Sequence, residues 1–211
     1  MRRTINGASR RYIEVLERPF QYDSDVTLVD DRPTAINGFF VDCGLTYSGP
    51  PATVISGPGH LEGETLIGLL DGSMATGLVV TGGSVTLPYS ASVAHLGLPY
   101  ESYARTHRYS GPSRDGYLFG RRVNTTGVYV DLLSTGSLEV GAYDATDMRT
   151  YETNPHASDA FTGNPVELVT GIVPCEVEGS RLSGDGRIVL RTSAPLPAII
   201  RMVEIKAEYT P

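Results

Sequence analysis

Residues 56–72 read SGPGHLEGETLIGLLDG, and this stretch indicates how the chain folds. Its first eight residues hold three glycines and a proline, a composition typical of a turn. An apolar run over 65–70 follows, and Asp71-Gly72 closes it with a dipeptide that favours a two-residue hairpin turn. The stretch therefore predicts a turn, a β-strand and a second turn.

The rest of the region 51–100 repeats this pattern of short apolar runs and turn signals. Gly82-Gly83 is a further turn signal between two such runs. The expected strands are 53–55, 65–70, 78–80, 84–87 and 92–96. Short strands about ten residues apart predict a small β-barrel or a strongly bent sheet.

The N-terminal region 1–50 is predicted as a hairpin and a connector. Asn6-Gly7 favours a hairpin turn, and the β-rich run 10–17 leads from it to Pro19; a short helix is the alternative for this run. Residues 20–50 are expected to be irregular, with a strand at 39–43. They include a small acidic cluster (Asp23, Asp25, Asp30 and Asp31), for which a solvated turn is favoured over a calcium site because the ordered calcium-loop pattern is missing.

Residues 101–211 are predicted to form a β-sandwich-like layer. The expected strands are 128–133, 137–140, 166–169, 187–191 and 198–208. Residues 101–116 are expected to form an exposed loop, and 142–165 a long polar excursion. The predicted fold class is all-β: a hairpin and connector over 1–50, a small β-barrel-like module over 51–100 and a β-sandwich-like domain over 101–211, with little or no helix.

Composition agrees with this fold class. The 211 residues include 24 glycines and 14 prolines, and the longest run free of both has 13 residues, which leaves little room for helices. The formal net charge of −7 argues against a protein that binds nucleic acid by neutralising phosphates over its whole surface. An acidic surface suits a protein that lets DNA pass without binding it, because like charges repel. A net negative charge more commonly serves to keep a protein soluble.

The sequence shows no catalytic constellation, metal-ligand spacing or phosphate-binding loop. His60 and Glu62 are two residues apart and would share a face of a strand, where they could act as an acid–base pair. The favoured interpretation is that both side chains bind backbone groups and hold a glycine-rich turn. We therefore expect no enzyme activity, no cofactor and no bound metal.

The two cysteines and the termini add further expectations. Cys43 and Cys175 lie far apart and outside any CxxC motif, so free, half-buried thiols are favoured over a disulfide. No apolar run of about 18 residues predicts a membrane span, and residues 1–7 lack the apolar core of a signal peptide. Arg121-Arg122 is a compact basic spot; a solvated rim or an ion pair between subunits is favoured over a DNA contact.

A set of short motifs, in chain order from about residue 5 to about residue 207, carries a family resemblance. In the first half they are His60-Leu61-Glu62-Gly63, Asp71-Gly72, Gly83-Ser84-Val85-Thr86-Leu87, Ala91-Ser92-Val93 and Gly97-Leu98-Pro99-Tyr100, and in the second half 120–123, 128–130, 138–141 and 194–197. Together they resemble the phage tail tubular proteins of the B type, also called tail nozzle or hub proteins. The resemblance is to the C-terminal part of that family, whose members usually carry a much larger N-terminal part.

The resemblance implies a structural virion protein of the phage tail, assembled in the host cytoplasm. It implies a ring of identical subunits, six-fold if the family pattern holds, that forms part of the DNA exit channel. The expected partners are other copies of the chain, neighbouring tail or adaptor proteins, and DNA that passes without sequence-specific binding. The motif residues would serve as structural turns.

Two other function classes stay open. One is a β-sandwich at the tail tip that binds a receptor or host carbohydrate, for which the tyrosines between Tyr100 and Tyr109, with Glu101, are the candidate residues. The other is an enzyme of unknown type, which the missing constellations disfavour.

Overall fold

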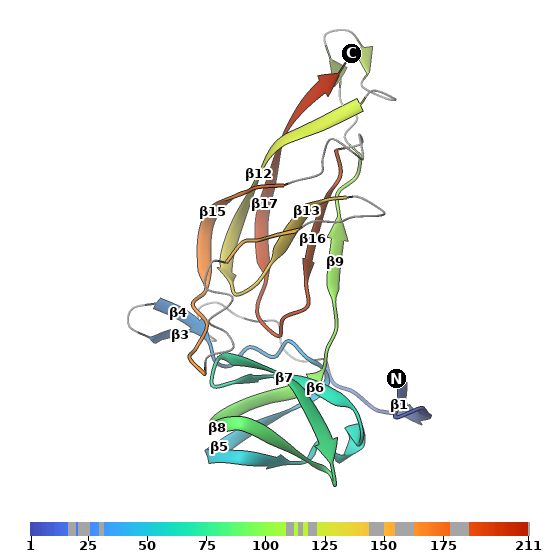
Figure 1. The fold of residues 1–211 in the computed structure, drawn as a ribbon, viewed down its shortest axis with the longest axis vertical. Coiled ribbons are helices and arrows are strands. Elements are labelled where there is room, and N and C mark those ends of the chain that lie inside the picture. Colours follow the sequence, from blue (N-terminus) through green and yellow to red (C-terminus); the bar gives the residue numbers. More distant parts are fainter. Residues whose placement is uncertain are drawn as a thin grey trace. The chain divides into compact units, whose positions relative to one another are not determined.

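The computed structural model of the chain describes residues 1–16, 20, 26–29, 32–108, 112–113, 116–117, 122–143, 150–154, 163–177 and 186–210. These residues form antiparallel β-strands and one short 3-10 helix, and none of them forms an α-helix (Figure 1). The predicted all-β fold class is thus confirmed. Within the same ranges, the chain offers no helix with the length and apolar character that crossing a bilayer requires.

The chain divides into two compact units. Unit 1 contains Met1–Tyr100, His156–Leu168 and Ser193–Pro197, and unit 2 contains Glu101–Pro155, Val169–Thr192 and Ala198–Pro211. This division differs from the expected one at residue 50, because strand β5 (Asp42–Ser56) runs across that boundary and joins both sides in one ladder. A unit boundary does lie after residue 100, but two later segments return to unit 1.

Unit 1 begins with a hairpin of β1 (Arg2–Ile5) and β2 (Ala8–Arg11). Asn6 and Gly7 form its turn with φ values of 46° and 74°, the left-handed conformations that an Asn-Gly hairpin turn requires. The predicted hairpin is confirmed, but the strand expected over 10–17 ends at Arg11. Residues 12–16 form neither a strand nor the alternative helix.

The connector expected to be irregular contains a second hairpin. Strands β3 (Val26–Val29) and β4 (Arg32–Ala35) pair there, and Thr34 forms a bridge to Glu167. The strand expected at 39–43 begins only at Asp42. The four acidic residues considered for calcium lie outside the described residues.

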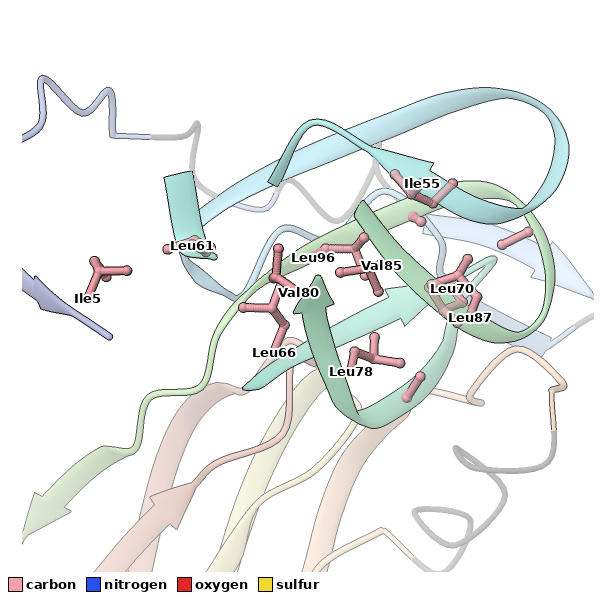
Figure 2. Close-up of a cluster of buried hydrophobic side chains, with 13 residues drawn as sticks. Ile5, Ile55, Leu61, Leu66, Leu70, Leu78, Val80, Val85, Leu87 and Leu96 are labelled. Atoms are coloured by element: carbon pink, nitrogen blue, oxygen red, sulfur yellow. The ribbon is translucent and has the colours of Figure 1, made fainter. Parts of the chain in front are cut away.

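The rest of unit 1 is a bent sheet that closes on itself. Besides β5 it contains β6 (Thr65–Leu70), β7 (Ser73–Thr81) and β8 (Ser84–Leu98). Strand β8 pairs with β5, β6 and β7, and β6 also pairs with β7, so the last three strands form a closed circuit. This arrangement is the barrel-like module that the strand spacing predicts. Its interior holds a cluster of buried apolar side chains, which Figure 2 shows.

Two strands of this module are longer than the sequence predicts. The runs 84–87 and 92–96 belong to one strand, β8, and 53–55 is the end of the long strand β5. Pro88 suggests a break because proline cannot donate to a ladder. The strand continues because Pro88 lies where the ladder is shifted, between the pairs Val54↔Thr86 and Ala52↔Ala91.

Unit 2 contains two antiparallel sheets that pack face to face. One has the order β15 (Val169–Cys175), β12 (Arg122–Thr135) and β17 (Ile199–Thr210). The other has the order β14 (Thr150–Glu152), β13 (Glu139–Ala142), β16 (Ile188–Thr192) and β9 (Ser102–Arg105). One buried cluster takes side chains from both sheets, among them Val130 and Leu132 of β12 and Val140 and Ile188 of the second sheet. This is the expected sandwich-like packing.

The regions of unit 2 predicted as loops also contain strands. Within 101–116, Ser102–Arg105 forms β9, and β10 (Pro112–Ser113) pairs with β11 (Gly116–Tyr117). Residues 102–105 are all exposed, as expected, but they pair with β16 along one edge of the sheet. The polar excursion 142–165 contains β14.

Candidate functional site

The sequence motif at residues 60–63 belongs to a turn that packs onto the core of the barrel-like module. Pro58–Leu61 is the 3-10 helix η1, flanked by Gly57 and Gly63 with φ values of 123° and 81°, which glycine adopts readily. Leu61 is completely buried and points into the apolar cluster (Figure 2). The His60 ring donates through Nε2 to the carbonyl of Cys43 at 2.9 Å. The motif is therefore a structural element of the module.

Glu62 holds a second turn in place. Its two carboxylate oxygens accept hydrogen bonds from the backbone N–H groups of Gly82 and Gly83, each at 2.8 Å. Hydrogen bonds that backbone N–H groups donate to a charged carboxylate are stronger than those between neutral groups. His60 and Glu62 thus bind different backbone groups, as the structural interpretation predicts, and their side chains form no hydrogen bond with each other.

Asp71-Gly72 is the tight turn between β6 and β7. Both residues have positive φ, 47° and 86°. The Asp71 carboxylate accepts hydrogen bonds from the N–H of Val93 at 2.7 Å and from the N–H of Ser92, the shorter at 2.9 Å. The backbone N–H of Asp71 donates in turn to the carbonyl of Val93 at 2.8 Å. Asp71 therefore joins its turn to the middle of β8.

The motif at residues 97–100 begins in a tightly packed position. A Cβ placed on Gly97 would lie 2.7 Å from the carbonyl oxygen of Asp42 and 2.9 Å from the Cα of Gly44. Only glycine allows β5 and β8 to approach this closely. Leu98 packs at the rim of the core, whereas Pro99 and Tyr100 are exposed.

A charged cluster that the sequence did not reveal attaches the N-terminal hairpin. The Arg3 guanidinium binds Glu14 through Nη2 at 2.8 Å and Asp42 through Nη2 at 2.7 Å, and it makes a second, shorter bond to each carboxylate. Ile5 of the same hairpin is buried in the core cluster, and Asn6 N–H donates to Glu64. Asp42 lies 39 residues from Arg3, so no local pattern could have paired them.

The first prediction concerns this hairpin. The hydrogen bonds from Arg3 lower the pKa of the Glu14 carboxyl below its usual range. Glu14 therefore stabilises the docked hairpin above the ordinary glutamate pKa of about 4.3, and this contribution is lost as pH falls through the lower folded-state value. We expect the methyl signals of Ile5, followed by NMR, to shift toward those of an exposed side chain as pH falls from neutral to about 3. In the variant E14Q, the Ile5 methyl signals should already lie closer to those of an exposed side chain at pH 7, and they should change less as the pH falls. If they change with pH as in the unchanged chain, Glu14 is not the group responsible.

The two cysteines are free thiols in this structure, as predicted. Cys175 is buried, and burial raises the pKa of its thiol to about 11. Cys43 is half-buried, and its pKa is also raised, chiefly by burial and partly by Glu14, against the opposing charge of Arg3. Both side chains are therefore protonated at neutral pH and poorly suited to nucleophilic chemistry. Among the described residues, no group of three His, Cys, Asp or Glu side chains could hold a metal ion.

The remaining sequence candidates are Arg121, Arg122 and the tyrosines between Tyr100 and Tyr109. Arg121 is outside the described residues, and Arg122 pairs with Thr210 through the backbone of β12. Of the tyrosines considered for carbohydrate binding, Tyr100 of unit 1 is 42% exposed and Tyr103 of unit 2 is 49% exposed, while Tyr109 is outside the described residues.

No protein-family model and no curated protein matches this chain. The resemblance to phage tail proteins therefore rests on the short motifs alone.

Proposed function

We propose that the chain is a structural protein of a phage tail, which assembles with copies of itself into a ring that forms part of the DNA exit channel. The observation that supports this most is the use of the motif residues. His60, Glu62 and Asp71 bind backbone groups, Leu61 fills the core and Gly97 permits close strand packing. Motifs that build a rigid fold suit a mechanical component better than a catalyst.

The two units offer the kind of surface that a ring requires. A closed ring with head-to-tail contacts needs two different, complementary patches on each subunit. Unit 1 is a bent, closing sheet and unit 2 is a two-sheet sandwich, so they present different surfaces. The net charge of −7 on each copy would add up around a ring and repel DNA, which would keep DNA mobile in the channel.

Mass photometry of the purified chain, beside negative-stain imaging of intact particles with a labelled antibody, tests this proposal. We expect ring-sized assemblies, with six copies as the expected number, or antibody label along the tail. Particles that carry no label at all would refute the proposal.

The alternative is a receptor- or carbohydrate-binding module at the tail tip. It is favoured by the large exposed fraction of Tyr103, because exposed aromatic rings bind the apolar faces of sugars. A stable monomer in solution, with label only at the distal tip and binding on a glycan array, would support this alternative over the ring.

A further inference from the structure

The N-terminal hairpin turns two arginines away from the core of unit 1. Ile5 belongs to the core cluster, so the residues that alternate with it along β1, Thr4 and Arg2, face away from that core. Their partners in the register, Ser9 and Arg11, lie on the same face of the hairpin. All four side chains are exposed, and we call these four residues the outer hairpin face.

The register brings the two positive charges of this face close together. Met1 and Tyr12 exchange two backbone hydrogen bonds at the open end of the hairpin. The next pair, Arg2↔Arg11, is therefore a non-hydrogen-bonded pair, in which opposite side chains lie closest. Like charges directly opposite each other destabilise a pair of strands. A bound anion would remove this repulsion.

The other face of the hairpin shows what a matched charge looks like. There the Arg3 guanidinium is bound by Glu14 and Asp42. Among the described residues, by contrast, neither Arg2 nor Arg11 forms an ion pair. The chain thus neutralises the arginine that faces its core and leaves the outer pair for an anion from outside.

The outer hairpin face also has the donors that an oxyanion requires. Arg2 Nε donates to Ser9 Oγ at 2.7 Å, which orients the guanidinium and leaves its terminal N–H groups available. The planar fork of an arginine matches the two oxygens of a carboxylate. The hydroxyl of Thr4 can donate a further hydrogen bond on the same face. The chemistry of this face therefore suits carboxylate groups.

The distribution of charge along the chain points to the source of these carboxylates. Residues 1–13 contain four arginines and no acidic residue. The rest of the chain contains 13 basic and 24 acidic residues, and its formal charge is −11. Every copy therefore carries a basic hairpin and an acidic remainder, and the hairpin of one copy attracts the remainder of another.

We propose that the outer hairpin face binds the acidic surface of a second copy of the chain, with carboxylates of that copy bound by Arg2 and Arg11. The contact is head to tail, because the basic and the acidic surface are different patches of each subunit. The inference rests on the proposed function in so far as that function includes assembly from identical copies. The second copy as the occupant is chosen on charge complementarity alone.

Sedimentation equilibrium of the full chain, over a range of protein concentrations, tests the proposal. The average mass should rise with protein concentration in 0.1 M salt and much less in 1 M salt, because the screening length falls from about 10 Å to about 3 Å. The variant R2Q/R11Q should associate at least about tenfold more weakly in 0.1 M salt. The Ile5 methyl signals of this variant should stay those of a buried side chain, which shows that the hairpin is still docked.

The matched control is R201Q/K206Q, which removes the same charge from unit 2. Arg201 pairs there with Asp131, and Lys206 lies 4.3 Å from the centroid of the Tyr129 ring. This control should associate almost as the unchanged chain does.

A mixing experiment tests the head-to-tail geometry. Dye-labelled R2Q/R11Q keeps its acidic surface, so it should bind the unlabelled unchanged chain although it does not bind itself. Failure of the mixed pair to form, while the unchanged chain associates, would refute the head-to-tail contact.

Three further results would overturn the proposal: a mass that does not depend on protein concentration, an equal effect of both double variants, or binding of DNA or a sulfated glycan to this face without self-association. Its failure can be told apart from that of the proposed function. Label on the tail, with self-association that R2Q/R11Q leaves unchanged, would refute the surface alone. Self-association lost in R2Q/R11Q, with no label on particles, would refute the tail location alone.

Discussion

The substitution Leu61→Ala is expected to lower the free energy of unfolding of unit 1 by about 2–5 kcal/mol. Leu61 is completely buried, and η1 directs it into the same cluster as Leu66, Val80 and Leu96 (Figure 2). The loss includes the transfer of the removed methyl groups and the cavity that they leave. The cavity will collapse little, because Glu62 and His60 hold the surrounding turns through backbone hydrogen bonds.

Hydrogen exchange of β8 amides, such as those of Ala94 and Leu96, measures this effect within unit 1. A local probe is needed because a chain with two units need not unfold in one step. The matched control is Leu16→Ala, the same chemical change at a side chain that is 97% exposed. It should change the stability by less than about 0.5 kcal/mol. Equal effects of the two variants would show that η1 does not anchor the core.

Local sequence signals correctly predicted the turns and strands that are specified by neighbouring residues. Asn6-Gly7 and Asp71-Gly72 form the turns that such dipeptides favour, and the apolar runs 65–70 and 128–133 lie in strands. The structural interpretation of Glu62 also held, because a carboxylate in a glycine-rich turn has backbone N–H groups within reach. These features need only a few neighbouring residues to be specified.

Features that depend on strand pairing were missed. The runs 84–87 and 92–96 were predicted as separate strands, yet β8 continues through both because a register shift leaves Pro88 outside the ladder. Arg3 meets Asp42 because the N-terminal hairpin packs against the rest of unit 1, and Arg105 meets Tyr143 because β9 and β13 both pair with β16. Neither contact has a signal in sequence spacing, since the register of a sheet is fixed by the whole core and not by one segment.

The substitution Gly97→Ala is expected to destabilise unit 1 by about 1–3 kcal/mol through overpacking. The added Cβ would lie 2.7 Å from the carbonyl oxygen of Asp42 and 2.9 Å from the Cα of Gly44. Both are backbone atoms in β5, so the strain cannot be relieved by rotating a side chain. We expect β5 and β8 to separate locally, and the Arg3 contact to Asp42 to weaken with them.

The matched control for this substitution is Gly59→Ala, where the nearest atom to the added Cβ is the Cα of Gly83 at 3.5 Å, an ordinary contact. It should change the stability by less than about 0.5 kcal/mol. Hydrogen exchange of β8 amides again gives the local stability, and the Ile5 methyl signal reports whether the hairpin stays docked. If Gly97→Ala exchanges as slowly as Gly59→Ala, then β5 and β8 can move apart at no cost. In that case, the glycine of the 97–100 motif would not be required by strand packing, and the structural account of that motif would be wrong.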